Sequence, residues 1–572
     1  MASVMPSAGT FDSVDGTLAR GAWQPVLFAE RPSRLELMKL HAEWELTPLT
    51  IRIHRNHSFE HVASATCSWF AWWGRDAQFV YSDYDDSLSF SFPEEEQASI
   101  ELVWLDAKRY EGRFTTEAFA SWIHDRCVAL RLRTSAPIIV AIIGTSDETS
   151  AILAQCTRSV PGLRMAHLSQ LAEMLGARFF DERASKFSGT RLSDAACLLI
   201  ARELSCRWVP ALLMPRIKAV VLDLDNTLHE GVLGEDGHAV RLTPGHHALQ
   251  QSLVRFREGG VFLGLSSRND DADVRRLFDD RPDFPLQWSH FSATAVSWGS
   301  KADGIRTMAR HLRIGVNAIL FVDDNPGELA SVTSELPGIS VAHAMPDAAA
   351  TQRMLDYYPG LWAWETTVTD VLRASDLAAS IERAQLVQGR DPLAYLRSLQ
   401  VRLLVETNPW RQLARLHELS NKTNQFNLAL QRMSEPDLAA ALDAPDHGVA
   451  LVSLNDRLSD SGPIALIMAR REGNSLVVIE LAISCRALGR CLEDVMIAAA
   501  IRAIRSELPT SRVEFLHRTG PRNTPAREWL ARLTGQVLRP EGRVSAPVGF
   551  LLASPPDFSV HFQVMHHEPR HG

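Results

Sequence analysis

Residues 218–237 of this chain read KAVVLDLDNTLHEGVLGEDG. The apolar run at 219–222 is typical of a central strand in a parallel sheet, covered on both faces. Two carboxylates, Asp223 and Asp225, follow at the carboxyl end of that strand, where open α/β sheets bind their ligands. Adjacent buried charges need a cation or a shared proton, and hard oxygen ligands favour Mg²⁺. Because such residues also cap helices, the pair alone leaves a cap and a metal site equally open.

Three further segments bring polar side chains to the same predicted sheet edge. A second apolar strand, at 261–265, ends in Ser266, Ser267, Arg268 and Asn269, and a hydroxyl at a strand end can hold a phosphate oxygen. Lys301 begins an amphipathic helical pattern in a chain where lysine is rare. A third strand, at 318–322, leads to Asp323 and Asp324. The order of these groups predicts a Mg²⁺-dependent phosphoryl-transfer site.

These motifs resemble those of the haloacid dehalogenase (HAD) superfamily: DLDNT, a strand-end serine, a lone lysine and VDDNP, in that order. More narrowly, LDLDNTL, GVLGEDG, SRNDD, WGSKADGI and FVDDNPGE are similar to the FkbH-like family, strongly so over residues 214–370. The resemblance implies an enzyme that takes a glyceryl unit from 1,3-bisphosphoglycerate and loads it onto an acyl carrier protein for polyketide assembly. The chain departs from the family at His229 and Glu230, where an aromatic residue and a glycine are usual.

The same resemblance implies a role for each residue of this site. Asp223 is the expected nucleophile on phosphorus, and Asp225 is the expected acid and base for the leaving oxygen. The phosphoryl group is expected to contact Thr227, Ser267 and Asn269, with Lys301 offsetting negative charge. The expected Mg²⁺ ligands are Asp223, the carbonyl of Asp225, and Asp324 together with Asp323 or Glu328. Such roles amount to positioning and electrostatic stabilisation.

Composition excludes several classes of function. The chain has 572 residues, 46% of them hydrophobic, which is enough for several folded domains. A net charge of −9 and a pI near 6.1 give no electrostatic footprint for nucleic acid. The first basic residue is Arg20 and no apolar stretch approaches ~18 residues, so neither a signal peptide nor a membrane span is expected. Seven cysteines without a C-x-x-C pair indicate reduced thiols, and we expect a cytoplasmic protein.

The region before the central domain is predicted to be a flexible start at 1–25 and a separate α/β domain at 26–213. Strands are expected at 49–53, 99–105 and 137–143, which indicates a flavodoxin-like three-layer fold. In related proteins this region is similar to SGNH hydrolases, but no G-D-S motif is present. We therefore favour a degenerate hydrolase fold with a docking or scaffolding role. Ser193 and Asp194 are interpreted as a helix cap, and the aromatic residues at 69–73 as core or an interface anchor.

Residues 371–572 follow a different pattern, with strands expected at 448–454, 464–468 and 476–483 and a helix after 490. This order resembles GNAT-type acyltransferases, so the whole chain is predicted to be a multidomain α/β protein: SGNH-like, HAD-like at 214–370, and GNAT-like. Arg486 and Gly489 match the acyl-CoA turn Q/R-x-x-G-x-G/A, but Cys491 occupies its last position. CoA is therefore not expected, and the phosphopantetheine thiol of a carrier protein is the expected acceptor.

Cys485 is the candidate nucleophile for acyl transfer. It follows a predicted strand, stands beside Arg486 and precedes a helix start, a setting that favours the thiolate, although an inert buried cysteine is equally open. SCR-x-x-GR and NKTNQFN also resemble the FkbH-like family. Within the second motif, Asn424 would suit a small hydroxylated acyl group, or belong to a hydrogen-bonded loop. Arg522 and Asn523 are further candidates for substrate binding. Two other functions stay open: a stand-alone metabolite phosphatase and a non-catalytic scaffold for a carrier protein.

Overall fold

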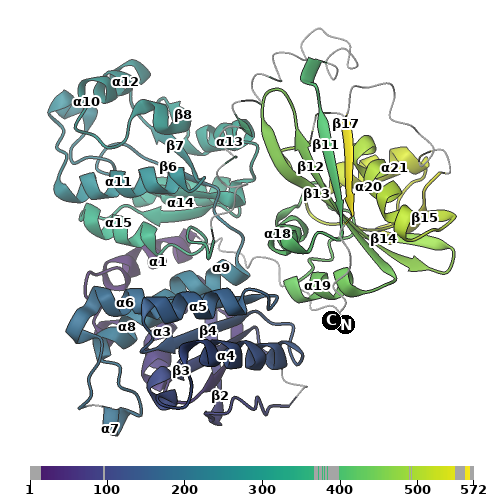
Figure 1. Cartoon of the computed structure of the whole chain (residues 1–572). Coiled ribbons are helices and arrows are strands. Elements are labelled where there is room, and N and C mark those ends of the chain that lie inside the picture. Colours follow the sequence, from purple (N-terminus) through teal and green to yellow (C-terminus); the bar gives the residue numbers. More distant parts are fainter. Residues whose placement is uncertain are drawn as a thin grey trace. The chain divides into compact units, whose positions relative to one another are not determined.

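The computed structural model describes residues 14–93, 97–183, 185–365, 372, 376–377, 379, 383, 398–488, 490, 492–547, 550 and 561–566. The chain divides into two units, Met1–Thr366 and Thr367–Gly572. The first holds two five-stranded parallel sheets and the second a seven-stranded mixed sheet (Figure 1). This is the α/β class that the sequence predicts, with parallel sheets followed by a mixed one. None of the helices in the described residues is long and apolar enough to cross a membrane.

The first parallel sheet has the strand order β2-β1-β3-β4-β5, which is the flavodoxin-like order. Its strands are β1 (Thr47–Arg55), β2 (Arg75–Tyr84), β3 (Ile100–Asp106), β4 (Ile138–Ile143) and β5 (Leu163–Ala166). Its helices are α2 (Arg34–Leu37), α3 (Glu60–Trp72), α4 (Thr116–Arg131), α5 (Asp147–Thr157), α6 (Leu168–Leu175), α7 (Ser185–Ser188), α8 (Asp194–Glu203) and α9 (Val209–Leu213). Separate apolar clusters fill its two faces, so the predicted three-layer arrangement and the three predicted strands are confirmed.

The second parallel sheet has the order β10-β9-β6-β7-β8, with β6 in its centre. Its strands are β6 (Ala219–Leu222), β7 (Phe262–Ser267), β8 (Phe291–Val296), β9 (Ile319–Asp323) and β10 (Ser340–His343). Its helices are α10 (Leu233–Asp236), α11 (Pro244–Glu258), α12 (Asp271–Asp280), α13 (Lys301–His311), α14 (Pro326–Glu335) and α15 (Ala348–Asp356). The chain reverses direction across the sheet between β6 and β9, which is where open α/β sheets bind ligands.

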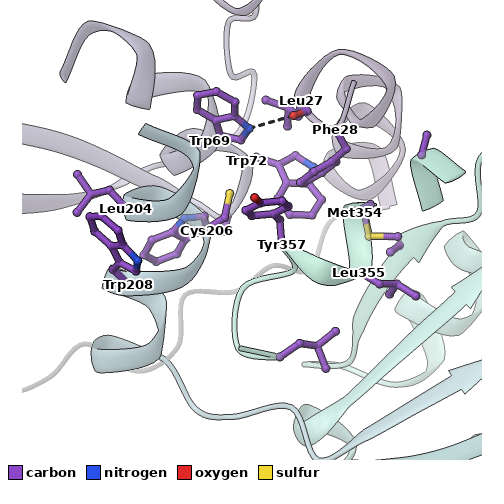
Figure 2. Close-up of a cluster of buried hydrophobic side chains, with 14 of the residues drawn as sticks. Leu27, Phe28, Trp69, Trp72, Leu204, Cys206, Trp208, Met354, Leu355 and Tyr357 are labelled. Carbon is purple, nitrogen blue, oxygen red and sulfur yellow. Dashed lines mark hydrogen bonds between the residues drawn. The ribbon is translucent and has the colours of Figure 1, made fainter. Parts of the chain in front are cut away.

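One apolar core runs through both parallel sheets of the first unit. Figure 2 shows Trp72 between Phe28 and the segment that carries Tyr357, and the Trp72 ring lies 5.0 Å from Phe28 and 5.5 Å from Tyr358. Residues 14–25 were expected to be mobile, but Val14–Leu27 forms helix α1. Two hydrogen bonds fix this helix, because the Gln24 amide donates to the His343 carbonyl (2.9 Å) and accepts from the His343 N–H (3.0 Å).

The mixed sheet of the second unit has the order β16-β15-β14-β13-β12-β11-β17. Its strands are β11 (Arg402–Thr407), β12 (His447–Asn455), β13 (Asp460–Glu472), β14 (Ser475–Ile483), β15 (Arg512–Arg518), β16 (Glu541–Ser545) and β17 (His561–His566). Its helices are α18 (Leu413–Lys422), α19 (Glu435–Asp443), α20 (Glu493–Glu507) and α21 (Thr524–Thr534). The three strands and the helix predicted here are confirmed by β12, β13, β14 and α20.

A short segment separates two strands of this mixed sheet. β14 and β15 are parallel and pair only over their first residues, Ser475–Val478 with Arg512–Phe515. Beyond that point the peptide of Leu428 takes the place of direct pairing, donating to the Leu481 carbonyl (3.1 Å) and accepting from the Arg518 N–H (2.8 Å). We call residues 426–428 the wedge. It satisfies peptide groups that the divergence of the two strands would otherwise leave without partners.

Candidate active site

A lysine and three carboxylates meet at the carboxyl edge of the second parallel sheet. Asp223 follows β6, Asp323 ends β9, and Lys301 begins α13. The Lys301 ammonium donates to Asp223 Oδ1 at 2.7 Å and to Asp323 Oδ2 at 2.6 Å, and all three side chains are buried. Asp324 completes the group, since carboxylate oxygens of Asp223, Asp323 and Asp324 lie within 4.8 Å of one another. The residues that the sequence assigned to the phosphatase chemistry therefore share one small volume.

The charges of this group are unbalanced. Burial raises the pKa of Asp223 to about 7, although the neighbouring ammonium of Lys301 opposes that rise. Burial also raises the pKa of Asp324, and the adjacent Asp323 carboxylate adds to the effect. Burial disfavours the charged form of Lys301, but attraction to Asp223 and Asp323 outweighs it and raises the lysine pKa. One ammonium against three carboxylates leaves room for a divalent cation, and oxygen ligands of this kind fit Mg²⁺.

Asp225 lies next to this group, but its carboxylate makes its hydrogen bonds to residues outside the group. Its Oδ1 accepts the Leu233 N–H (2.8 Å) and its Oδ2 accepts the Asn269 amide (2.8 Å). The next residue, Asn226, has a left-handed backbone conformation (φ 52°) that turns the chain sharply after Asp225. The Asn226 side chain accepts a hydrogen bond from the Gly231 N–H at 3.0 Å. A carboxylate fixed beside Asp223, outside the cluster of three, has the position expected of a general acid and base.

The predicted phosphate contacts fall into two groups. The Thr227 hydroxyl is buried and has no hydrogen-bond partner among the described residues, so it is available to a ligand. Ser267 and Asn269 are bonded to each other, the Asn269 amide donating to Ser267 Oγ at 2.9 Å. Glu328, offered as a metal ligand, instead pairs with Arg268 at 2.7 Å. Asn269 therefore serves first to orient Asp225, a role that spacing in the sequence did not indicate.

The N-terminal helix also supports the acidic loop. The His343 ring donates a hydrogen bond to the Asp324 carbonyl at 2.9 Å, and the backbone of His343 is held by Gln24 of α1. A chain of three contacts thus connects α1 to a predicted metal ligand. This connection could not be predicted from the sequence, because the contact joins residues 319 positions apart.

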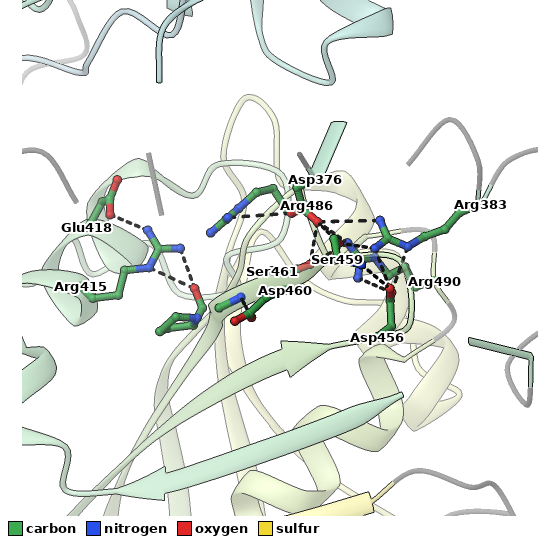
Figure 3. Close-up of polar contacts among 12 residues, drawn as sticks. Asp376, Arg383, Arg415, Glu418, Asp456, Ser459, Asp460, Ser461, Arg486 and Arg490 are labelled. Carbon is green, nitrogen blue, oxygen red and sulfur yellow. Dashed lines mark hydrogen bonds and ion pairs between the residues drawn. The ribbon is translucent and has the colours of Figure 1, made fainter. Parts of the chain in front are cut away.

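Cys485 stands at the end of β14 and is half-buried. Arg486, the residue after Cys485, belongs to a largely buried group of arginines and aspartates that Figure 3 shows. We call Asp376, Arg383, Asp456, Arg486 and Arg490 the arginine cluster. Arg383 makes two 2.9 Å hydrogen bonds to Asp456, and Arg490 approaches both aspartates. Arg486 lies 3.8 Å from Asp376 Oδ2. The cluster joins three arginines to two aspartates, and its member Arg486 directly follows Cys485 in the chain.

The turn after Cys485 does not lead directly into helix α20. Helix α20 starts only at Glu493, and its first turn already carries Glu493 and Asp494, which complement the helix dipole. The helix amino end is thus not free for a phosphate next to Cys485. Gly489 and Cys491, the fourth and sixth residues of the predicted turn, lie outside the described residues.

The other predicted substrate contacts in this unit are bonded within the protein. Asn424 Oδ1 accepts from Arg432 at 2.6 Å. Asn523 is fully buried, donates to the carbonyls of Asn427 (2.9 Å) and Arg518, and accepts the Gly520 N–H. These contacts give both asparagines a structural role, which is the hydrogen-bonded loop left open for Asn424. Arg522, next to Asn523, is exposed.

The carboxyl edge of the first parallel sheet is closed by an ion pair. Arg191 makes two hydrogen bonds to Asp106, of 2.8 and 2.9 Å, and its guanidinium stacks on Phe180. Gly144 allows this approach, because a Cβ at that position would meet the guanidinium at 2.1 Å. Ser193 accepts the Ala196 N–H and caps α8, which confirms the cap interpretation.

Comparisons with known proteins find no matching family model and no matching curated protein. Three solved structures are similar in part. The N-terminal part of BF1531 from Bacteroides fragilis, containing a phosphatase domain complexed with Mg, is 17% identical with a TM-score of 0.43, over 59% of this chain and 99% of that one. A GNAT-family acetyltransferase from Streptococcus pneumoniae is 14% identical (TM-score 0.18, 23% and 81%). A mutant of the cAMP-binding acyltransferase from Mycobacterium smegmatis is 16% identical (0.18, 36% and 60%).

Proposed function

We propose that this chain is a Mg²⁺-dependent phosphatase coupled to an acyltransferase, which loads a glyceryl unit from 1,3-bisphosphoglycerate onto an acyl carrier protein. The observation that carries the phosphatase half is the contact of one buried lysine with Asp223 and Asp323, beside Asp324. Support for the glyceryl and carrier steps comes from the sequence resemblance to the FkbH-like family. Mg²⁺ held by Asp223, Asp323 and Asp324 would supply positive charge to the phosphoryl oxygens.

The geometry supports a two-step hydrolysis. An oxygen of ionised Asp223 attacks phosphorus, the bond from phosphorus to the substrate oxygen breaks, and Asp225 gives its proton to that oxygen. Water then attacks the aspartyl phosphate, Asp225 takes the proton back, and inorganic phosphate leaves. Thr227 offers its unbonded hydroxyl to the phosphoryl oxygens. Lys301 keeps Asp223 in place throughout.

The second unit would carry out the acyl transfer. In this proposal the Cys485 thiolate attacks the carbonyl carbon of the acyl phosphate, and the bond to the phosphate oxygen breaks. The thiol of the carrier's phosphopantetheine then takes the acyl group from Cys485 and regenerates the thiolate. The arginine cluster, whose member Arg486 directly follows Cys485, would attract a departing phosphate.

Intact-protein mass spectrometry tests both halves at once. A phosphopantetheinylated carrier protein is incubated with the full chain, Mg²⁺ and freshly generated 1,3-bisphosphoglycerate. We expect a glyceryl adduct on the carrier, a phosphoglyceryl adduct with Asp223→Asn, and no adduct with Cys485→Ala. Cys67→Ala removes an exposed cysteine elsewhere and is the matched control. A carrier adduct formed equally well by Cys485→Ala would remove this thiol from the mechanism.

A stand-alone phosphatase is the second candidate, because the whole Asp223 site lies in the first unit. Phosphate release that depends on Asp223 but needs no carrier would favour it. In that case the second unit would organise partners without chemistry of its own.

A further inference from the structure

Trp298 differs from every other tryptophan of the chain. The chain has 14 tryptophans, all in the described residues, and 13 of them are buried or half-buried. Trp298 is 76% exposed, between Ser297 and Gly299, which are themselves exposed. Tryptophan is among the residue types most enriched at the energetic centres of protein interfaces.

The position of Trp298 ties it to the phosphatase site. It lies in the loop between β8 and Lys301, the residue whose ammonium holds Asp223. The same loop is fixed to the site edge, because the Ser297 N–H donates to the Ser267 carbonyl at 3.0 Å. A molecule bound to Asp223 through its phosphate would therefore pass close to this loop.

Helix α13 continues from this loop with a positively charged face. Arg306 and Arg310, four residues apart, are exposed on one side of the helix, and the exposed Arg313 follows two residues after the helix ends at His311. Within the described part of the chain Arg306 pairs with Asp303, whereas Arg310 and Arg313 make no ion pair. We call these three arginines the arginine face. At a rise of about 1.5 Å per residue, Arg310 lies roughly 14 Å along the helix from Lys301. The surface thus combines an aromatic side chain at the site with arginines farther away.

We infer that Trp298 and the arginine face of α13 form the docking surface for an acidic carrier protein whose phosphopantetheine arm delivers a phosphorylated acyl group to Asp223. The arm is extended, so the acyl end lies far from the surface of the carrier. Trp298 likewise lies far along the surface from Arg310 and Arg313, so the arm could reach Trp298 while the carrier contacts the arginines. Its amides and methyl groups suit contact with an indole ring. This rests on the proposed function and adds an order to it: the phosphate leaves after the acyl group has reached the carrier.

Binding of a fluorescently labelled carrier protein tests this surface without any turnover. The probe is an acyl carrier protein with its phosphopantetheine arm (holo) or without it (apo), added to the full chain in the absence of Mg²⁺. Trp298→Ala should weaken holo binding by about tenfold and apo binding much less. Arg310→Glu with Arg313→Glu should weaken both by about tenfold and flatten their salt dependence. Arg158→Glu with Arg178→Glu, two exposed arginines of the first sheet's domain, is the matched control.

Kinetics then separate docking from chemistry. For Trp298→Ala, the rise in KM for carrier-bound phosphoglycerate should exceed the rise for free glycerol phosphate at least tenfold. Equal losses on both substrates would make Trp298 part of the phosphate site and overturn the docking surface. If the wild type binds the carrier and neither variant weakens that binding, the docking surface is overturned and the proposed function still stands. The same holds if Trp298→Ala changes only the stability of the chain. Absence of any carrier binding by the wild type would overturn both.

Discussion

At the scale of single residues, Lys301 is the residue on which the site most depends. Its ammonium is the buried partner of both Asp223 and Asp323. Lys301→Met should destabilise the chain by roughly 3–5 kcal/mol without Mg²⁺, because two buried carboxylates lose their counter-charge. Saturating Mg²⁺ should recover part of that loss. Urea unfolding in EDTA and in Mg²⁺ measures both values, and Lys218→Met, outside the cluster, serves as the control. Equal losses in the two buffers would argue against a cation at these carboxylates.

The raised pKa of Asp223 predicts a pH dependence for the metal-free protein. Its folded pKa of about 7 lies above its ordinary value, so the folded state holds a proton that the unfolded state loses. Stability from this group is therefore greatest below about pH 4, declines as the pH rises to about 7, and is then constant. Mg²⁺ needs the ionised form, so its affinity should fall by up to tenfold per pH unit below 7. Calorimetric titrations with Mg²⁺ at several pH values should show this fall. The Asp223→Asn variant should bind Mg²⁺ weakly, with an affinity that does not change with pH over this range.

The sequence identified the chemical groups of this site but not all of their contacts. Asp223, Lys301, Asp323 and Asp324 could be predicted because each follows or begins a strongly patterned element whose end fixes its place. The partners of Asp225 and Glu328 could not, since a hydrogen bond between neighbouring loops depends on side-chain directions. The same limit applies to the arginine cluster, whose aspartates come from distant parts of the chain.

At the scale of elements, the wedge is the feature that local pattern could not indicate. Its Asn427 is fully buried, donates to Glu480 at 2.9 Å and accepts the Leu430 N–H at 2.8 Å. Glu480 is itself buried, and burial raises its pKa, so it depends on these donors. For the NKTNQFN motif the sequence left contact with an acyl group and a hydrogen-bonded loop both open, and the contacts of Asn427 are those of a hydrogen-bonded loop beside β14.

A pair of asparagine variants tests that role. Asn427→Ala should destabilise the second unit by roughly 2–4 kcal/mol, because it leaves Glu480 and a peptide group short of partners. Asn424→Ala removes a single acceptor from half-buried Arg432 and should cost about 1 kcal/mol or less. Hydrogen exchange at residues 479–483 and 516–518 would localise the effect. If Asn427→Ala lost acyl transfer while keeping its stability, direct contact of Asn427 with the substrate would be favoured instead.

At the scale of the whole molecule, the sequence pattern predicted a domain boundary after residue 213, but one apolar core includes residues from both sides of that boundary. Helices α1, α3 and α15 pack around the same aromatic residues, and Gln24 reaches across to His343. Helical periodicity shows which face of a helix is apolar, but not which element covers it. The sequence therefore predicted the two sheets correctly and could not predict that they share a core.

The shared core makes a prediction about cooperativity. Trp72 contacts Phe28 and Tyr358, so Trp72→Ala removes a side chain on which both sheets pack, at a cost of about 3–5 kcal/mol. In scanning calorimetry, residues 14–365 should unfold in one transition that this variant lowers, while the transition of the second unit stays in place. Mg²⁺ should raise the first transition alone, because ligand binding stabilises only the unit that holds the site. Trp529→Ala, in the core of the second unit, should lower the transition of the second unit and leave that of residues 14–365 in place. Should Trp72→Ala split the first transition into two, the parallel sheets would be independent domains after all.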